Sequence, residues 1–565
     1  MFALILHKNK KSSDKSALLT HKYLSNKLFT NNDLDKNHED SFYKNNIYVV
    51  AKGFCEKRKN INLSEYIYNQ INSSSNKYPK LEFSYISYNE KKDIITAAID
   101  RFGAQPIYYF NSDKILIISN KNKFIKDYLK LSELDKSWMY NSLTGLLSDK
   151  TTTSIKGIKK LPPAHYLEFK NKQLEIKQYW KLEKQDLGNL SLNDYIVNFK
   201  YLLTESVKNR IQDNLGAELS GGLDSSGIVG ISSKFKANIY TYSHSLPDNL
   251  LGKFFPYKDE REFCNLVTRY NDISDKNRKI QCNNASIFNI QKNELKILGM
   301  PTNIALTYFS NELLNTAQKD NIKTIFSGFG GDEGVSNQGS FMIYQWARNF
   351  NLYQLVKNKK NFIKHIIQVY SKNYKTHLYN HDNSLLNKDF SEENSFINNQ
   401  KKLNYRTLSD FIHYRLSGNY LPNRMEQFQQ TAMYRGINYS FPLLDYKLVE
   451  FYYSIPDKYK FYKAQKRYLF KEAIKDFAPK EVYTRNDKTG ATVPNVLHRF
   501  MIDYDEIYDY LQSSKNGKAS EYINIKEMIS RMELIKQLYQ GNRIRANQHI
   551  FFNALMIVIY LNEDY

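Results

Sequence analysis

Cysteine is scarce in this sequence, and long apolar runs are missing. The 565 residues include three cysteines, Cys55, Cys264 and Cys282, which form no Cys-x-x-Cys pair. Neither a zinc site nor a disulfide framework is therefore predicted, and a reducing cytoplasm fits this composition. The apolar run at residues 551–561 is about half as long as a membrane-spanning helix requires, so it predicts a core helix. Residues 1–6 are too short for a signal peptide and have no basic start, so they predict a strand. We expect a cytoplasmic protein with no membrane partner.

Negative charge is also in short supply. The chain has 81 Lys and Arg residues against 58 Asp and Glu, which gives a formal net charge of +23. Such an excess is compatible with a nucleic-acid partner. The basic residues are nevertheless interspersed with acidic ones, and Lys, Asn, Ile and Tyr are abundant throughout the chain. We therefore interpret the charge as a property of overall composition and predict no nucleic-acid partner.

The length and the 41% hydrophobic content predict two or more domains with buried cores. Up to about residue 185, short β-type runs alternate with polar turns, at residues 48–51, 81–85, 94–99 and 115–118, and a turn with a strand follows at 157–169. From about residue 190, strands alternate with helices, which is typical of a parallel sheet. The expected helices are 192–210, 227–235 and 263–270, and the expected strands are 217–219, 238–243 and 324–327. Beyond residue 340 the pattern is mostly helical, apart from a polar stretch at 380–402 that predicts a surface loop or a disordered insert.

The segment Ser220-Gly221-Gly222-Leu223-Asp224-Ser225-Ser226 follows a predicted strand and precedes a predicted helix. Its glycines let the backbone approach an anion closely, and the loop N–H groups and the helix N-terminus favour negative charge. Asp224 would repel a phosphate unless Mg²⁺ lies between them, so we predict that the loop grips a magnesium-bound pyrophosphate. An ordinary strand-to-helix turn with an Asp or Ser cap is the plainer alternative, but the full string of residues argues against it. The Gly-Lys-Ser/Thr of a Walker A loop is missing.

A second glycine-rich segment, Ser327-Gly328-Phe329-Gly330-Gly331-Asp332-Glu333, also follows a predicted strand. At the carboxyl ends of a parallel sheet, two such loops face one crevice, which is where ligands bind in open α/β folds. Asp332 is then placed to share a Mg²⁺ with Asp224. A glycine-rich turn with solvated acidic residues is the alternative when this segment is taken alone.

A third segment, residues 485–490, brings an arginine and a lysine together in the string Arg-Asn-Asp-Lys-Thr-Gly. Arg485 and Lys488 are able to neutralise charge on a leaving pyrophosphate or on an adenylation transition state. Taken alone this signal is weak, because Lys and Arg are abundant here and are usually solvated.

These segments together resemble the asparagine synthetase family, which includes β-lactam synthetases and lasso-peptide cyclases. Residues 220–226 match the pyrophosphate loop of that family in full, and residues 327–333 resemble its second loop. Further similar segments are Gly436-Ile437-Asn438-Tyr439-Ser440-Phe441-Pro442-Leu443-Leu444-Asp445, Arg467 to Lys471, Arg485 to Lys488, Asp100 to Tyr109 and Ile158 to Tyr166. The resemblance spans nearly the whole chain.

The resemblance implies an α/β fold with two domains. Residues 1–185 are expected to form a glutamine-amidotransferase-like α/β/β/α sandwich. Residues 190–565 are expected to form an ATP-pyrophosphatase synthetase domain whose C-terminal part is mostly helical.

The resemblance also implies a reaction. ATP and Mg²⁺ would convert a substrate carboxylate to an acyl-adenylate with loss of pyrophosphate, and an amine or ammonia would then attack to form an amide. By position, Asp224 and Asp332 would bind Mg²⁺, and Lys488 would stabilise the adenylation and amidation transition states. The residues placed by resemblance at ATP or pyrophosphate are Glu218, Ser220, Gly221, Gly222, Leu223, Asp224, Ser225, Ser226, His244, Ser327, Gly328 and Arg485. A histidine at a strand end is more often structural, so the backbone of His244 is its expected contact.

The sequence departs from the family at the start of the chain. Glutamine-hydrolysing members use an N-terminal cysteine exposed after removal of Met, but position 2 is Phe here and no cysteine precedes Cys55. The Asn-Gly-Glu-Ile-Tyr-Asn glutamine-binding motif is missing as well. We therefore expect no glutamine hydrolysis by this route. Ammonia would come free or from another protein, or an amine of the substrate would replace it.

Two further departures concern the substrate. Phe329 lies where asparagine synthetases usually carry Glu, β-lactam synthetases Tyr and lasso cyclases often His, so an apolar or aromatic substrate wall is predicted. Residues 438–440 read Asn-Tyr-Ser where the family commonly has Glu-x-Arg. Both changes argue against L-aspartate as the substrate and leave the ATP half of the site intact.

Several functions stay open from the sequence. Within the family, the substrate is aspartate, a peptide or amino-acid-derived carboxylate closed on itself as in lasso-peptide or other macrocycle-forming cyclases, or a sugar carboxylate. From other classes, the alternatives are a catalytically inactive scaffold and a tRNA-modifying enzyme with a similar loop. The sequence does not determine the oligomeric state, and a homodimer is left open.

Overall fold

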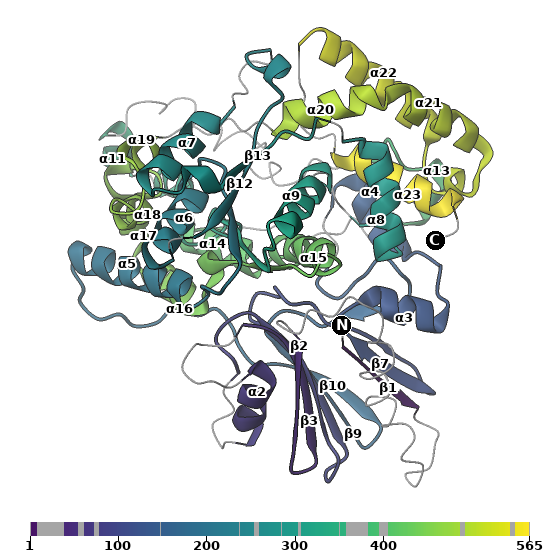
Figure 1. The fold of residues 1–565 in the computed structure, drawn as a ribbon, viewed down its shortest axis with the longest axis horizontal. Coiled ribbons are helices and arrows are strands. Elements are labelled where there is room, and N and C mark those ends of the chain that lie inside the picture. Colours follow the sequence, from purple (N-terminus) through teal and green to yellow (C-terminus); the bar gives the residue numbers. More distant parts are fainter. Residues whose placement is uncertain are drawn as a thin grey trace.

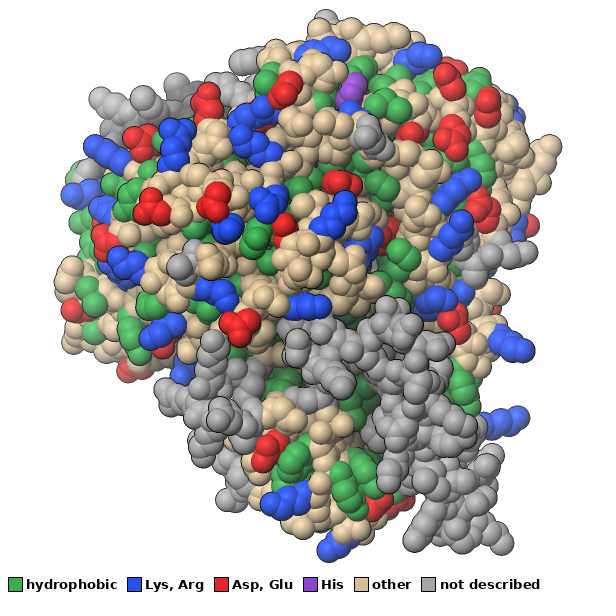
Figure 2. Space-filling view, in the orientation of Figure 1, with side chains coloured by type: hydrophobic (Ala, Val, Ile, Leu, Met, Phe, Trp, Pro, Cys, Tyr) green, Lys and Arg blue, Asp and Glu red, His purple; other side chains and the backbone are tan. Residues whose placement is uncertain are grey.

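The computed structural model describes residues 2–7, 39–54, 62–72, 78–146, 149–236, 238–253, 259–283, 285–302, 307–349, 351–357, 382–394, 405–485, 492–542 and 549–563. Figure 1 shows a β-rich N-terminal part below a larger part that contains a second sheet and many helices. No helix within these ranges is both long and apolar enough to cross a membrane. On the face drawn in Figure 2, Lys and Arg side chains are scattered among Asp and Glu.

Two antiparallel sheets form the N-terminal part. The four-stranded sheet has the order β1-β7-β6-β8, and the six-stranded sheet has the order β10-β9-β5-β4-β3-β2. The strands are Ala3–His7 (β1), Glu39–Lys44 (β2), Ile47–Gly53 (β3), Phe83–Asn89 (β4), Ile94–Ile99 (β5), Tyr108–Asn111 (β6), Ile115–Ser119 (β7), Lys159–Lys160 (β8), His165–Lys170 (β9) and Gln173–Gln178 (β10). The runs expected at 48–51, 94–99 and 115–118 are therefore strands, whereas the run at 81–85 joins its strand only at Phe83.

Neighbouring residues of one strand serve two different cores here, because side chains alternate across a sheet. In β1, Leu4 lies between the two sheets, whereas Ile5 lies in the core on the opposite side of its sheet. Helix α3 (Asn122–Leu129) packs on that side, and helix α2 (Leu63–Asn72) covers the outer face of the six-stranded sheet. The layers are α/β/β/α, as the sequence predicted.

The second sheet is parallel and has the order β13-β12-β11-β14-β15. Its strands are Leu215–Glu218 (β11), Tyr240–His244 (β12), Asn277–Ile280 (β13), Thr324–Phe326 (β14) and Asn438–Ser440 (β15). In chain order, β12 and β13 are added on one side of β11, and β14 and β15 are then added on its other side. The carboxyl ends of β11 and β14 therefore lie at a topological switch point, where open α/β sheets form their ligand crevice.

Helices surround this sheet and form most of the chain beyond residue 340 (Figure 1). Those used below are α5 (Leu192–Lys208), α6 (Leu223–Phe235), α7 (Arg261–Tyr270), α9 (Thr307–Lys319), α14 (Leu408–Ser417), α15 (Tyr420–Met433), α16 (Tyr446–Ser454), α18 (Tyr468–Ala473) and α23 (His549–Asn562). Helix α23 is buried along residues 550–560, so the apolar run near the C-terminus is a core helix, as predicted.

Two local predictions were wrong. Helix α6 begins at Leu223 rather than at 227, because Gly222 is its N-cap and the loop residues that follow already form the first turn. The polar stretch at 380–402 contains helix α13 (Lys388–Glu393), although residues 380–381 and 395–402 lie outside the described part. The side chain of Asn387 caps this helix, and Phe390 is buried against Tyr522, so one apolar anchor and a cap overcome the polar composition.

A buried ionic network joins the N-terminal part to the synthetase-like part. Arg210 follows α5 and is 2% exposed; its Nε lies 2.9 Å from Glu82 Oε2, and its Nη1 lies 3.0 Å from Asp445 Oδ2. Burial opposes the ionised form of Glu82, but Arg210 and the backbone N–H of Phe441 lower the pKa of this carboxyl overall. A second pair, Lys160 with Glu426, joins the two parts at 2.7 Å.

Candidate active site

Strand β11 ends at Glu218, and the loop that follows turns directly into α6. Gly221 has a φ of +69°, and a Cβ at this position would lie 2.8 Å from Phe263 Cβ, so only glycine fits. The hydroxyl of Ser225 accepts a hydrogen bond from the backbone N–H of Ser220 at 3.1 Å and holds the loop closed. The first turn of a helix directs its N–H groups outward, and together with the helix dipole this makes the start of α6 favourable for an anion.

Asp224 and Asp332 both contact the guanidinium of Arg467. Nη1 of Arg467 donates to Asp224 Oδ2 at 3.1 Å, and Nη2 donates to Asp332 Oδ1. Arg467 is the N-cap of α18 and has a φ of +59°. Burial opposes the charged form of Arg467, but the two carboxylates outweigh it and raise the pKa of the guanidinium. The fold thus brings the two predicted metal-binding acids to one cationic centre.

The second glycine loop packs directly on the first. A Cβ on Gly328 would lie 3.0 Å from the backbone nitrogen of Ser225, and a Cβ on Gly331 would lie 3.0 Å from Asp224 Cγ. Any larger side chain at either position would push the loops apart. The two glycines therefore set the distance between Asp224 and Asp332, as expected for loops that share one crevice.

Glu218, the last residue of β11, is half-buried and joins this strand to Ser327 after β14 and to Tyr439 in β15. Its Oε2 accepts a hydrogen bond from Ser327 Oγ at 2.5 Å, and its Oε1 accepts one from the hydroxyl of Tyr439 at 3.2 Å. Burial raises the pKa of Glu218, and the two hydroxyl donors oppose this shift in part. Ser327, at the end of β14, is thus held by a carboxylate from β11 and is 2% exposed.

His244 ends β12 in a site that keeps it neutral. Burial lowers the pKa of His244 to about 4. Its Nε2 lies 3.2 Å from the hydroxyl of Tyr308 and 3.1 Å from Nδ2 of Asn495, and its ring stacks on Phe309. Because an amide nitrogen only donates, Nε2 is the acceptor and the proton lies on Nδ1. The imidazole is engaged by its neighbours, which favours the backbone as the part of His244 that faces a ligand.

Arg485 supports the first loop from the side. Its Nη1 donates to the carbonyl oxygen of Gly221 at 3.2 Å, and its charge is paired with Glu260, with Nη1 2.5 Å from Oε2. The guanidinium also lies 3.7 Å from the ring centre of Phe263. Lys488, the other basic residue of this segment, lies outside the described residues.

Phe329 points into an aromatic cluster formed by α15 and the segment after β15. Its ring centre lies 5.8 Å from that of Tyr420, 5.6 Å from Phe428 and 6.1 Å from Phe441. Arg424 lies over Phe428, with 4.7 Å between its guanidinium carbon and the ring centre. Its described side-chain hydrogen bond goes to Gln427, and within the described residues no carboxylate forms an ion pair with it. The side chains that contact Phe329 are aromatic, and Arg424 adds a cation beside them.

Phe2 occupies the interior of the N-terminal sandwich. Its side chain is 2% exposed and belongs to the core between the two sheets, together with Leu4. Its backbone N–H donates to Asn120 Oδ1 at 2.9 Å. Phe2 is thus an apolar core residue whose side chain carries no nucleophilic atom.

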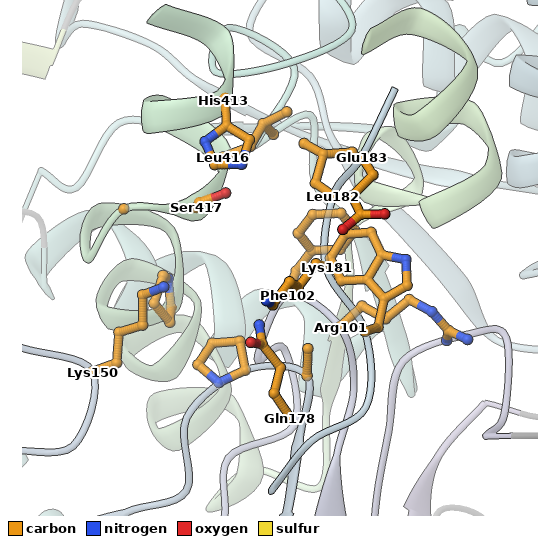
Figure 3. Close-up of a pocket in the computed structure, with 15 residues that line it drawn as sticks. Arg101, Phe102, Lys150, Gln178, Lys181, Leu182, Glu183, His413, Leu416 and Ser417 are labelled. Atoms are coloured by element: carbon orange, nitrogen blue, oxygen red, sulfur yellow. The ribbon is translucent and has the colours of Figure 1, made fainter. Parts of the chain in front are cut away.

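A separate cavity of about 410 Å³ lies between the two parts of the molecule (Figure 3). It is lined by N-terminal residues such as Phe102 and by the turn between α14 and α15, and it includes neither Asp224 nor Asp332. The converging carboxylates and glycine loops, rather than the size of a cavity, define the candidate active site.

Comparison with known proteins agrees with this arrangement. The chain belongs to the asparagine synthase family, whose model matches residues 198–554, and a model of the glutamine amidotransferase domain matches residues 68–180. The family is one of carbon–nitrogen ligases, and the chain also carries its amidotransferase-type domain.

Individual relatives are distant. Asparagine synthetase (glutamine-hydrolyzing) 3 of Bacillus subtilis is 22% identical over 84% of this chain and 79% of its own length. Putative asparagine synthetase (glutamine-hydrolyzing) 2 of Methanocaldococcus jannaschii is 26% identical over 37% of this chain and 45% of its own. Amidase chry2 of Gibberella zeae is 30% identical over 27% of this chain, and the alignment covers 23% of that protein. Among solved structures, the NH3-dependent NAD synthetase of Campylobacter jejuni aligns with a TM-score of 0.17, which supports no structural argument.

Sequence reasoning missed three residues of the site. Arg467 was noted as part of a basic segment without a partner, although it joins Asp224 and Asp332. Tyr439 was noted as a departure, although it holds Glu218. Arg424 gave no signal, because one arginine on a helix is indistinguishable from a solvated one without its neighbours.

Proposed function

We propose that this chain is an ATP-dependent amide ligase that adenylates a carboxylate, releases pyrophosphate and transfers the acyl group to ammonia or an amine. One observation carries the proposal. Asp224 and Asp332 come from loops more than 100 residues apart and converge on a single cation, Arg467, at the mouth of the pyrophosphate loop. A structural turn would have no need of two carboxylates at that point.

The residues present fit a magnesium ion. Mg²⁺ usually takes one or two protein carboxylates and completes its octahedron with water and substrate phosphates. Asp224 and Asp332 are such a pair, and Arg467 marks the place where positive charge is favoured. No third His, Cys, Asp or Glu joins them within the described residues, so phosphate oxygens would complete the set. A bound Mg²⁺ would neutralise charge on the phosphates during adenylation.

Different residues of this chain have different roles in the proposed reaction. The backbone of residues 220–226 holds the pyrophosphate, with Ser225 keeping the loop closed. Glu218, Ser327, Gly328 and the backbone of His244 form the nucleotide side of the crevice. Arg485 holds Gly221 through a hydrogen bond to its carbonyl oxygen. Lys488 stabilises the negative charge that develops in the adenylation and amidation steps. Arg467 exchanges its two carboxylates for phosphate oxygens when the nucleotide binds.

The substrate is proposed to differ from aspartate. Phe329 and its neighbours Phe428 and Phe441 offer no carboxylate for an ammonium group, and Arg424 adds positive charge beside them. These surroundings favour a carboxylate with an apolar or aromatic body. A peptide closed into a macrocycle and a sugar carboxylate stay as alternatives within this proposal.

The amine is proposed not to come from glutamine. The core position of Phe2 supports an N-terminal domain that is retained for its contacts with the synthetase part rather than for hydrolysis. Free ammonia, another protein or the substrate itself would supply the nitrogen.

Exchange of labelled pyrophosphate into ATP tests the proposal. A panel should include aspartate, aromatic amino acids, aromatic acids and sugar acids, each with Mg²⁺. We expect exchange with at least one aromatic member, its loss in Lys488→Ala, and amide formation with ammonium but not with glutamine. Absence of both exchange and ATP binding would favour an inactive scaffold instead, and near-normal exchange in Lys488→Ala would refute the role of that residue.

A further inference from the structure

The cavity between the two parts of the molecule is lined by polar groups that the protein leaves unsatisfied. Lys150, His413 and Ser417 all line it (Figure 3). Within the described residues, none of the three side chains forms a hydrogen bond or an ion pair. Lys150 is half-buried, and burial lowers the pKa of its ammonium group. A partly buried cation without a protein partner, in one cavity with two polar side chains, is an anion-binding arrangement.

The rest of the lining combines aromatic and apolar residues with the polar or charged side chains of Arg101, Gln178, Lys181 and Glu183. Phe102 and Trp180 meet edge to face, with ring centres 5.4 Å apart. The indole nitrogen of Trp180 already donates to Glu450 Oε1 at 2.6 Å, so the ring offers its apolar surface and not its donor. Leu182 and Leu416 line the same cavity. A volume of about 410 Å³ falls within the range of small-molecule sites.

We propose that this cavity binds a small organic anion with a flat apolar body. Lys150 receives the anionic group, a carboxylate or a phosphate, and the hydroxyl of Ser417 and a ring N–H of His413 are the neighbouring donors. Phe102 and Trp180 contact the flat body. The site is distinct from the adenylation crevice, because its lining includes neither glycine loop.

The α14–α15 turn connects this cavity to the candidate active site. Leu416 lines the cavity, and a Cβ on Gly334 would lie 2.9 Å from Leu416 Cδ2, so Leu416 packs against the end of the second loop. The preceding residue, Arg415, pairs with Glu333 at 2.6 Å. An occupant that fixes this turn therefore acts on the loop that carries Asp332. This regulatory consequence rests on the proposed function, whereas the binding site does not.

Calorimetric titration of the full-length chain without ATP tests the binding site. The probes are 1-naphthylacetate for an aromatic carboxylate, AMP for an aromatic phosphate, and inorganic phosphate for the anion alone. We expect saturable binding of 1-naphthylacetate or AMP that Lys150→Met weakens by at least about tenfold, the loss typical of a charge-assisted hydrogen bond. Lys150→Arg should restore it, and Lys170→Met, on an exposed strand end outside the cavity, should change nothing.

Each outcome of these titrations supports or overturns a stated part of the proposal. Binding of 1-naphthylacetate that depends on Lys150 assigns a carboxylate ligand, and such binding of AMP alone assigns a phosphate ligand. Failure of both aromatic probes to bind in a Lys150-dependent way would overturn the site, and inorganic phosphate that binds as tightly as they do would overturn the aromatic half. Thermal unfolding of Lys150→Met beside Lys150→Arg shows whether a loss reflects misfolding. Pyrophosphate exchange is then measured with and without saturating probe, which tests the regulatory step. Absence of any pyrophosphate exchange would count against the proposed function and not against the binding site.

Discussion

Replacement of Asp224 by Asn tests whether the two acidic loops form a metal site. The amide has nearly the shape of the carboxylate, so the loop contacts of Gly328 and Gly331 are preserved. What is lost is one of the two negative charges that face Arg467. We expect Asp224→Asn to abolish most of the gain in ATP affinity that Mg²⁺ provides.

The magnitude follows from the observed contact. Asp224 Oδ2 lies 3.1 Å from Arg467 Nη1, which shows how close a cation approaches. Two unit charges at about 3 Å interact by about 5 kcal/mol when the effective dielectric constant is about 20. Loss of a single charged hydrogen bond costs at least about 1.5–3 kcal/mol. The expected loss of about 2–5 kcal/mol corresponds to a factor of at least about 30 in affinity.

The assay needs no knowledge of the carboxylate substrate. The dissociation constant of ATP is measured by calorimetry with Mg²⁺ and with EDTA, in the wild type and in Asp224→Asn. A matched control is Asp320→Asn, because Asp320 also pairs with an arginine, Arg278, at 3.1 Å but lies outside the crevice. The same Mg²⁺ dependence in Asp224→Asn and in the wild type would refute the metal site.

Three further predictions concern the fold and the N-terminal domain. Arg210→Met should destabilise the chain by about 3–5 kcal/mol, because Glu82 stays buried without its partner, and Glu82→Gln in the same chain should recover much of it; thermal unfolding that shows no recovery would contradict the network. His244 has its pKa lowered to about 4, below the ordinary 6.5, so its contribution to stability is complete above pH 6.5 and falls by about 3 kcal/mol as the pH drops towards 4. His244→Gln should therefore unfold with a shallower acid dependence than the wild type, and identical profiles would argue against a buried neutral imidazole. Phe2→Cys should lower the unfolding temperature without creating glutaminase activity, and ammonia release from glutamine by this variant would refute the core role of Phe2.

The sequence predicted the long and strongly patterned elements. Helix α5 and the core helix α23 were visible because their apolar residues extend over many turns. Strands β13 and β15 were not predicted, since they have four and three residues and lie at the edges of the sheet beside one strand each; β14 is as short, but a glycine-rich loop follows it. Segments this short carry little periodicity, and only the neighbouring strand decides that they are strands.

The candidate active site likewise has a part that the sequence predicted and a part that it did not. The glycine loops carried a local signal, because close backbone approach and a left-handed φ at Gly221 demand glycine whatever the rest of the fold. The residues that form side-chain contacts in the site carried no such local signal. Arg424 and Arg467 are two among 81 basic residues, and their roles depend on which aromatic rings or carboxylates the tertiary structure places beside them.

The sequence by itself predicted the chemistry: a loop suited to pyrophosphate, two acids suited to Mg²⁺, and an apolar Phe2 in place of a nucleophile. These depend on residue type and on near neighbours in the chain. The tertiary structure decided which groups meet. It joined Asp224 and Asp332 through Arg467, placed Phe329 in an aromatic cluster and enclosed Lys150 at the junction of the two parts. Contacts between residues more than 100 positions apart are set by packing of whole elements, and no local pattern encodes them.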